Sequence, residues 1–122
     1  MKLFLLLGIL NGFLAVALGA FGAHGLEGKL SEKMLATWEK AVQYQMFHTV
    51  ALLVTGLAMQ KITSGSMVSA GWFFFAGILL FSGSLYIYST TQIKTFAMIT
   101  PIGGVAFLIG WVLLGYAVIK HI

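Results

Sequence analysis

Three side chains that can exchange protons or hydrogen bonds lie close together in an otherwise apolar stretch. Tyr44, Gln45 and His48 are separated by three and four residues, a spacing at which side chains on one helix can meet. Burying a histidine among apolar residues is costly without a partner, so an ionisable group there is a functional hypothesis by default. Two interpretations of His48 stay open: a neutral hydrogen-bonding contact between helices, or a proton-responsive or ligand-contacting site.

His24 is a second candidate, at the end of the first apolar run. Paired with His48 across a helical hairpin, it would supply two axial ligands to a haem iron. His48 lies about two turns deeper, however, and a zinc ion would need Glu27 or Glu39 as further ligands. We therefore expect no metal site and no cofactor.

Asn11 and Trp38 complete the polar cluster that we expect around His48. A single asparagine within an apolar helix commonly hydrogen-bonds across helices and fixes their register. Trp38 precedes the second apolar run, and with Tyr44 it fits an aromatic belt at the membrane surface. The chain has no Ser-His-Asp set, phosphate-binding loop or zinc-protease helix motif, so we expect it not to be an enzyme.

The elements that must position these residues are membrane helices. Of the 122 residues, 60% are hydrophobic and only 8% are charged, with a mean hydropathy of +1.00, whereas soluble domains have about 25% charged residues. A helical span needs about 20 apolar residues. Four segments qualify, and they predict one all-α, four-transmembrane-helix bundle over residues 1–122, with spans at about 3–22, 41–59, 68–88 and 97–119.

The link between the first two spans holds all three acidic residues of the chain. Ser31 is a good N-cap and Glu32 suits a first turn, so residues 32–38 predict an amphipathic helix at the membrane surface that continues into the second span. The seven lysines are dispersed and arginine is absent. Such lysines are typical of membrane anchors and not of a nucleic-acid surface.

Small residues form a stripe along the first span, with steps of four and three residues. This period places them on one helix face, where another helix can approach closely. We expect leucine at Gly12 or Gly19 to overpack this contact, and Gly8, near the membrane edge, to tolerate more. The predicted packing residues, including two from the last span, are Gly8, Gly12, Ala15, Gly19, Gly22, Gly103 and Gly110.

Several motifs occur in an order that resembles one family. They are Gly19-Ala-Phe-Gly-Ala-His-Gly-Leu26, Trp38-Glu-Lys-Ala41, Tyr44-Gln-x-x-His48, Phe81-Ser-Gly-Ser-Leu-Tyr86, Thr100-Pro-Ile-Gly-Gly104 and Gly110-Trp111. The chain resembles the uncharacterised bacterial membrane proteins of domain-of-unknown-function family 423, which is related to eukaryotic transmembrane protein 256. The resemblance implies a multi-pass protein of the bacterial plasma membrane and supplies no activity. The motif positions that it singles out are His24, Trp38, Tyr44, Gln45 and His48.

We expect a non-enzymatic protein of the lipid bilayer that binds or passes a small molecule, lipid or ion. Its site would lie between the first and second spans, and a homo-oligomer is compatible with the small-residue stripes. One alternative is a structural or accessory subunit whose stripes dock on a larger partner. Another is a haem or quinone redox protein.

Overall fold

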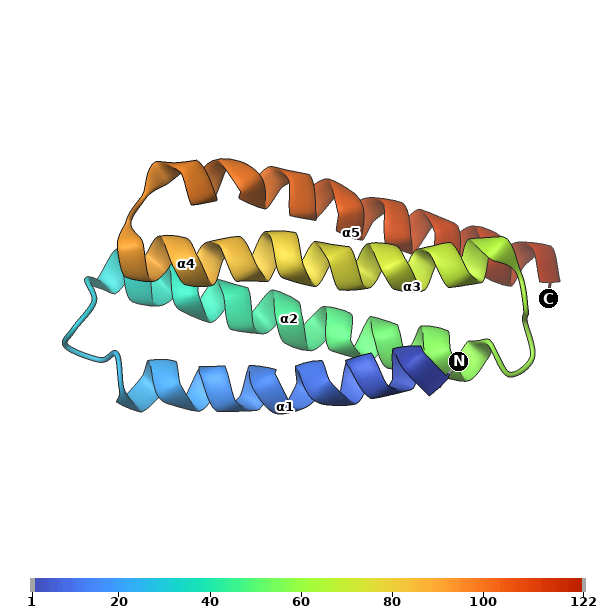
Figure 1. Ribbon diagram of the computed structural model, residues 1–122, viewed down its shortest axis with the longest axis horizontal. Coiled ribbons are helices and arrows are strands. Elements are labelled where there is room, and N and C mark those ends of the chain that lie inside the picture. The colour runs from blue at the N-terminus through green and yellow to red at the C-terminus, as the bar shows by residue number, and fades with distance from the viewer. Residues whose placement is uncertain (1, 122) are drawn as a thin grey trace.

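The computed structural model describes residues 2–121, and all regular structure in that range is helical. Four antiparallel helical rods lie side by side in chain order, with both ends of the chain at one end of the bundle (Figure 1). The third rod is continuous and comprises α3, a π-helical segment η1, and α4. The bounds are α1 Lys2–His24, α2 Glu32–Ala58, α3 Gly65–Gly77, η1 Ile78–Ser82, α4 Gly83–Thr91 and α5 Lys94–His121.

Local capping chemistry sets the helix ends. The Ser31 hydroxyl accepts a hydrogen bond from the Met34 backbone N–H at 3.2 Å, and Ser64 does the same for Met67 at 3.2 Å. Each cap satisfies one of the donors left open in a first helical turn. Gln92 takes a left-handed conformation with φ of 58° and ends α4. The links between the rods are short, so consecutive rods run antiparallel.

The helix expected at residues 32–38 is continuous with the second span, as the sequence predicts. Residues 32–38 are the first turns of α2, and Trp38 is buried against α1 and α4. Its indole Nε1 donates to the Leu18 carbonyl at 2.9 Å, and its ring meets Tyr86 edge-on at 4.6 Å. Gly22 makes room for the indole, because a Cβ there would lie 2.5 Å from Trp38 Cδ1. Trp38 is thus a packing residue here.

Three rods, and not four, are apolar and long enough to cross a membrane within residues 2–121. They are α1, the continuous rod Gly65–Thr91, and α5. The predicted span at residues 41–59 falls short of this apolar content, although α2 is long enough to cross. The reason is that Gln43, Gln45 and His48 interrupt the apolar sequence of α2.

The small-residue stripe of α1 lies against α2. Gly8, Ala15 and Gly22 are buried, and Gly12 and Gly19 are half-buried. A Cβ at Gly8 would lie 2.7 Å from Leu53 Cδ2, whereas a Cβ at Gly12 would have its nearest neighbour at 3.5 Å. A first methyl group at Gly8 therefore requires the Leu53 side chain to move, whereas at Gly12 it makes an ordinary contact.

The last helix approaches the π-helical segment closely. A Cβ at Gly103 would lie 2.7 Å from the Leu80 backbone carbon, so α5 touches the backbone of η1 there. A Cβ at Gly110 would lie 2.8 Å from Phe74 Cδ1. These two glycines set the distance between α5 and the third rod, and the central core fills the space among the rods with buried Phe74, Leu52 and Met67.

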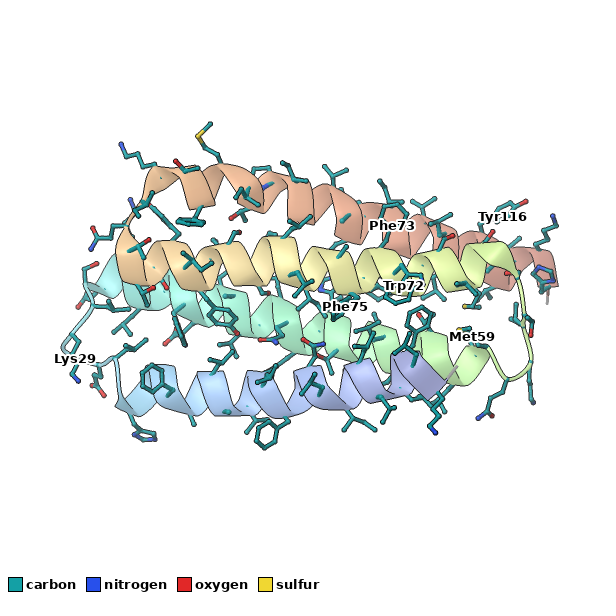
Figure 2. All side chains as sticks on the ribbon, viewed as in Figure 1. Lys29, Met59, Trp72, Phe73, Phe75 and Tyr116 are labelled. Carbon is teal, nitrogen blue, oxygen red and sulfur yellow. The ribbon has the colours of Figure 1, made fainter. Side chains whose placement is uncertain are left out.

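Charged and apolar side chains are segregated along the bundle. Figure 2 shows Lys29 at the end formed by the α1–α2 link, and Met59 and Tyr116 towards the other end. Between the ends, large apolar side chains are exposed, including Phe13 (71%) and Val112 (70%). A surface of this kind suits hydrocarbon, since a soluble protein rarely exposes apolar patches this continuous.

Candidate functional site

The polar side chains of α2 serve two different neighbours. Gln45 points to α1 and α4, where it is buried, and His48 points to α5. Sequence spacing predicts that Tyr44, Gln45 and His48 can meet side chain to side chain. In the structure Gln45 separates from the other two, because it faces α1 and α4. Tyr44 and His48 stay together on the other side of α2, with their rings stacked at 6.2 Å between centroids.

Gln45 is the centre of a buried hydrogen-bond chain across three helices. Its Nε2 donates to Asn11 Oδ1 at 3.0 Å, and its Oε1 accepts from the Tyr86 hydroxyl at 2.7 Å. Asn11 Nδ2 donates to the Leu7 carbonyl at 2.8 Å. Asn11 and Gln45 are each 4% exposed. These hydrogen bonds connect α1, α2 and α4 at one level of the bundle.

Both ring nitrogens of His48 have hydrogen-bond partners. Nδ1 lies 2.8 Å from the Tyr44 carbonyl oxygen, and Nε2 lies 3.1 Å from the indole Nε1 of Trp111. A carbonyl can only accept and an indole N–H can only donate. These partners assign the neutral tautomer that carries its proton on Nδ1 and accepts at Nε2.

Aromatic rings surround the imidazole on the α5 side. The ring of Phe107 is stacked on His48 with centroids 3.5 Å apart and planes 9° apart. Trp111 and Phe47 approach the imidazole at 5.8 and 5.3 Å between centroids. Tyr44 lies 4.5 Å from Phe81 of the π-helical segment.

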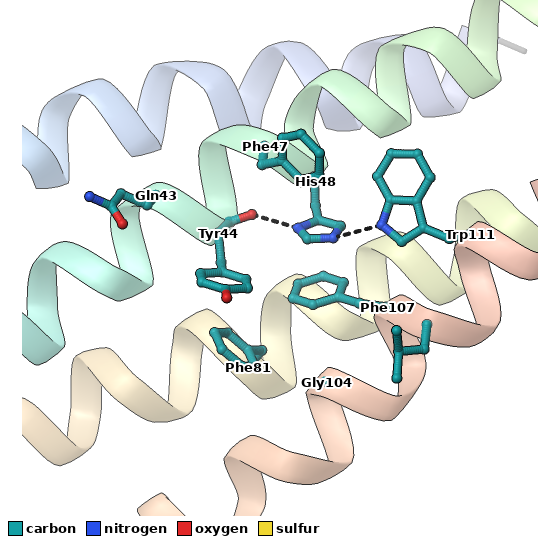
Figure 3. A pocket seen from close by; sticks show the side chains of 9 residues that line it. Gln43, Tyr44, Phe47, His48, Phe81, Gly104, Phe107 and Trp111 are labelled. Atoms are coloured by element: carbon teal, nitrogen blue, oxygen red, sulfur yellow. Dashed lines mark hydrogen bonds between the residues drawn. The ribbon is translucent and has the colours of Figure 1, made fainter.

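These rings line an open groove of about 430 Å³ (Figure 3). Its walls come from α2, η1 and α5. Some of the lining side chains are exposed at the outer face, including Phe47 (60%) and Leu108 (67%). Gly104 leaves part of the α5 wall without a side chain. The lining residues are Gln43, Tyr44, Phe47, His48, Phe81, Gly104, Phe107, Leu108 and Trp111.

The hairpin of α1 and α2, where sequence spacing predicts the site, holds a smaller hollow of about 210 Å³. It lies beside Trp38 and Glu39, on another side of α2 from His48. His24 is exposed at the end of α1 and is not joined to the other candidate residues by any hydrogen bond within residues 2–121. The larger groove therefore lies between the second and last helices.

A metal site finds no set of ligands in the part of the chain that the structure describes. No group of three or more His, Asp or Glu side chains comes together there. The Nε2 lone pair of His48, which a haem iron would need, accepts the Trp111 hydrogen bond. His48 would have to lose that bond before it could ligate iron.

Several residues of these two clusters lie outside the polar set chosen by spacing, among them Tyr86 in the buried chain, and Phe81, Phe107 and Trp111 in the groove. Tyr86 and Trp111 are 41 and 63 residues from their partners on α2. Local periodicity holds no signal for such pairs. Phe81, Tyr86 and Trp111 do fall inside the motifs that carry the family resemblance.

The family model described as "Protein of unknown function (DUF423)" matches residues 18–104. The matched range contains both Gln45 and the groove residues up to Gly104. The chain belongs to this family. Similar proteins match along essentially their whole length, and no solved structure matches the chain significantly.

Two relatives illustrate the similarity. The UPF0382 membrane protein YwdK of Bacillus subtilis is 53% identical over 123 residues, covering 100% of both chains. A UPF0382 membrane protein of Staphylococcus aureus is 57% identical over 120 residues, covering 98% of each chain. The chain is thus a member of an uncharacterised family of membrane proteins.

Proposed function

We propose that all four rods, α2 included, cross the cell membrane. Two of the three polar residues that lower the apolar content of α2 face protein: Gln45 bonds to Asn11 and Tyr86, and His48 bonds to Trp111. The third, Gln43, is exposed and lines the groove. Among residues 2–121, Thr49 Oγ1 is the one buried side-chain polar atom without a hydrogen-bond partner. A helix whose polar groups are satisfied inside the protein can lie in hydrocarbon despite its composition.

The outward face of α2 supports the same proposal. Its exposed side chains include the apolar Met46, Phe47, Val50, Val54 and Leu57, beside the polar Gln43 and Tyr44. With 27 residues, α2 is as long as the continuous third rod. At 1.5 Å per residue it exceeds the roughly 30 Å of a bilayer core.

Single cysteines test the topology, because the chain has none of its own. In intact cells, a membrane-impermeant maleimide reaches only the outer side of the membrane. It should therefore label one of the two variants Lys29→Cys and Thr63→Cys and leave the other unlabelled, because the two positions lie on opposite sides. Gln92→Cys should label with Lys29→Cys. If Lys29→Cys and Thr63→Cys label from the same side, α2 does not cross and the four-span proposal is wrong.

We propose that the groove beside His48 binds an uncharged small molecule that reaches it from the bilayer. The observation that carries this proposal is an open, aromatic-lined hollow of about 430 Å³ at an apolar face. Ligand pockets commonly have volumes of about 300–1,000 Å³, apolar walls and a few placed polar groups. A π-helical segment in the wall, supplying Phe81, adds support, since such segments are frequent at functional sites.

Gly104 offers a way to fill the groove without disturbing the helices. A Cβ there would lie 3.8 Å from Phe81 Cδ2, an ordinary contact, so Gly104→Leu projects into the hollow. Gly115, also on α5, has no atom within 4 Å of its Cβ position, and Gly115→Leu is the matched control. Native mass spectrometry of protein extracted in mild detergent should show a retained small molecule in wild type and Gly115→Leu.

Gly104→Leu should lose that molecule. If the wild type carries no bound molecule, or if Gly104→Leu retains it equally, the groove is not a binding site. Docking on a larger partner through small-residue stripes has less support, because α1 presents its stripe to α2, and α5 presents Gly103 and Gly110 to the third rod.

A further inference from the structure

The walls of the groove restrict the charge of a molecule that fits it, which extends the binding proposed above and rests on it. Among residues 2–121, no Glu or Lys lines the groove, and His48 uses both ring nitrogens within the protein. A charged group there would have no counter-charge in an apolar surrounding, which is costly. The part of a ligand that lies between the helices must therefore be uncharged.

The ring geometry favours a flat molecule. The planes of Tyr44, His48 and Phe107 lie within 22° of one another. Five of the lining residues are aromatic and Leu108 is the aliphatic one. Aromatic faces gain most from offset stacking on another ring. A flexible acyl chain gains no stacking there and loses rotamer freedom when it is ordered.

Two polar groups are available at one end of the groove. Tyr44 and Gln43 both line it, and neither side chain makes a hydrogen bond within residues 2–121. Figure 3 shows both residues on α2, on the side of His48 away from Trp111. A hydroxyl and an amide can donate to a ring carbonyl oxygen.

We infer that the groove takes a flat-ring amphiphile of the quinone class. One or two fused rings would lie against Tyr44 and Phe107, with a ring carbonyl accepting from the Tyr44 hydroxyl. An apolar tail would leave over Leu108, which is exposed at the outer face. The assignment concerns binding alone and includes no electron transfer.

Trp111 reports on occupancy of the groove, because quinones quench tryptophan fluorescence on contact. The protein in phosphatidylcholine nanodiscs is titrated with a naphthoquinone that bears one short prenyl tail. Wild type and Gly115→Leu should show saturable quenching, and Gly104→Leu should show only the linear quenching of a probe dissolved in the bilayer. Tyr44→Phe should weaken binding about fivefold to tenfold, the value of one hydrogen bond.

Competition identifies the class. A naphthalene with the same tail should displace the naphthoquinone more weakly, and a straight-chain alcohol of equal carbon number should barely displace it. If the alcohol competes as well as the naphthoquinone, and Tyr44→Phe binds like wild type, the groove holds acyl chains and the ring assignment is wrong, although groove binding stands. If quenching is linear in every variant, the quinone class is excluded, and native mass spectrometry decides separately whether anything occupies the groove.

Discussion

Replacing Gln45 by leucine tests the buried hydrogen-bond chain with little change in side-chain volume. The change removes the donor to Asn11 Oδ1 and the acceptor of the Tyr86 hydroxyl, and leaves both groups without these partners. Polar contacts between membrane helices average about 0.6 and reach about 1.7 kcal/mol each. The two bonds together predict a loss of about 1–3 kcal/mol, a fall of roughly 5- to 150-fold in the folded-to-unfolded ratio.

Unfolding in mixed micelles with increasing dodecyl sulfate, followed by circular dichroism, measures this loss. Gln43→Leu is the control on the same helix, because Gln43 is exposed and should cost nothing. The double variant Gln45→Leu with Tyr86→Phe should lose less than the sum of its single variants, since both remove the same bond. Additive losses, or a Gln45→Leu variant as stable as Gln43→Leu, would refute the buried chain.

Three further changes follow from the contacts. His48→Gln should still accept the hydrogen bond from Trp111, whereas His48→Leu cannot. In the same unfolding assay, the glutamine variant should therefore be more stable than the leucine variant by about 1 kcal/mol, the value of one hydrogen bond, to within about 0.5 kcal/mol. Equal stability of the two variants would contradict the His48–Trp111 bond. In ¹⁵N spectra of histidine-labelled protein at pH 7.5, the His48 ring should carry its proton on Nδ1, and a proton on Nε2 would contradict the tautomer assigned here. Gly103→Ala should destabilise the protein by about 1–3 kcal/mol through overpacking against the η1 backbone, whereas Gly104→Ala should be neutral, and similar losses would place the close crossing elsewhere.

The sequence predicts the helices and the packing face of α1 because both depend on local periodicity. Gly8, Ala15 and Gly22 recur at helical spacing, and any close neighbour must meet that face. Spacing also identifies Gln45 and His48 as buried polar groups in need of partners. Those partners lie on other helices, and Tyr86 and Trp111 are fixed by how the rods pack rather than by any local pattern.

The mean hydropathy of a segment does not predict its surroundings when some of its residues face protein and others face outward. Composition sets α2 apart from the other rods, although Gln45 and His48 are buried and large apolar side chains are exposed on its outer face. Spacing also places the site in the first hairpin, because His24 and His48 lie on consecutive helices. In the structure His24 is exposed and His48 faces α5. The groove arises from the crossing of α5 at Gly103 and Gly104, which no single helix encodes.

An experimental density map of the protein in lipid nanodiscs tests the central claim most directly. The account predicts ordered, non-protein density over Gly104, between Phe81, Phe107 and Trp111, with His48 still bonded to the indole. Density for the Gly104→Leu variant should show the leucine in its place. A closed groove, in which the Phe47 and Leu108 side chains fill the hollow and leave no space for a ligand, would contradict it.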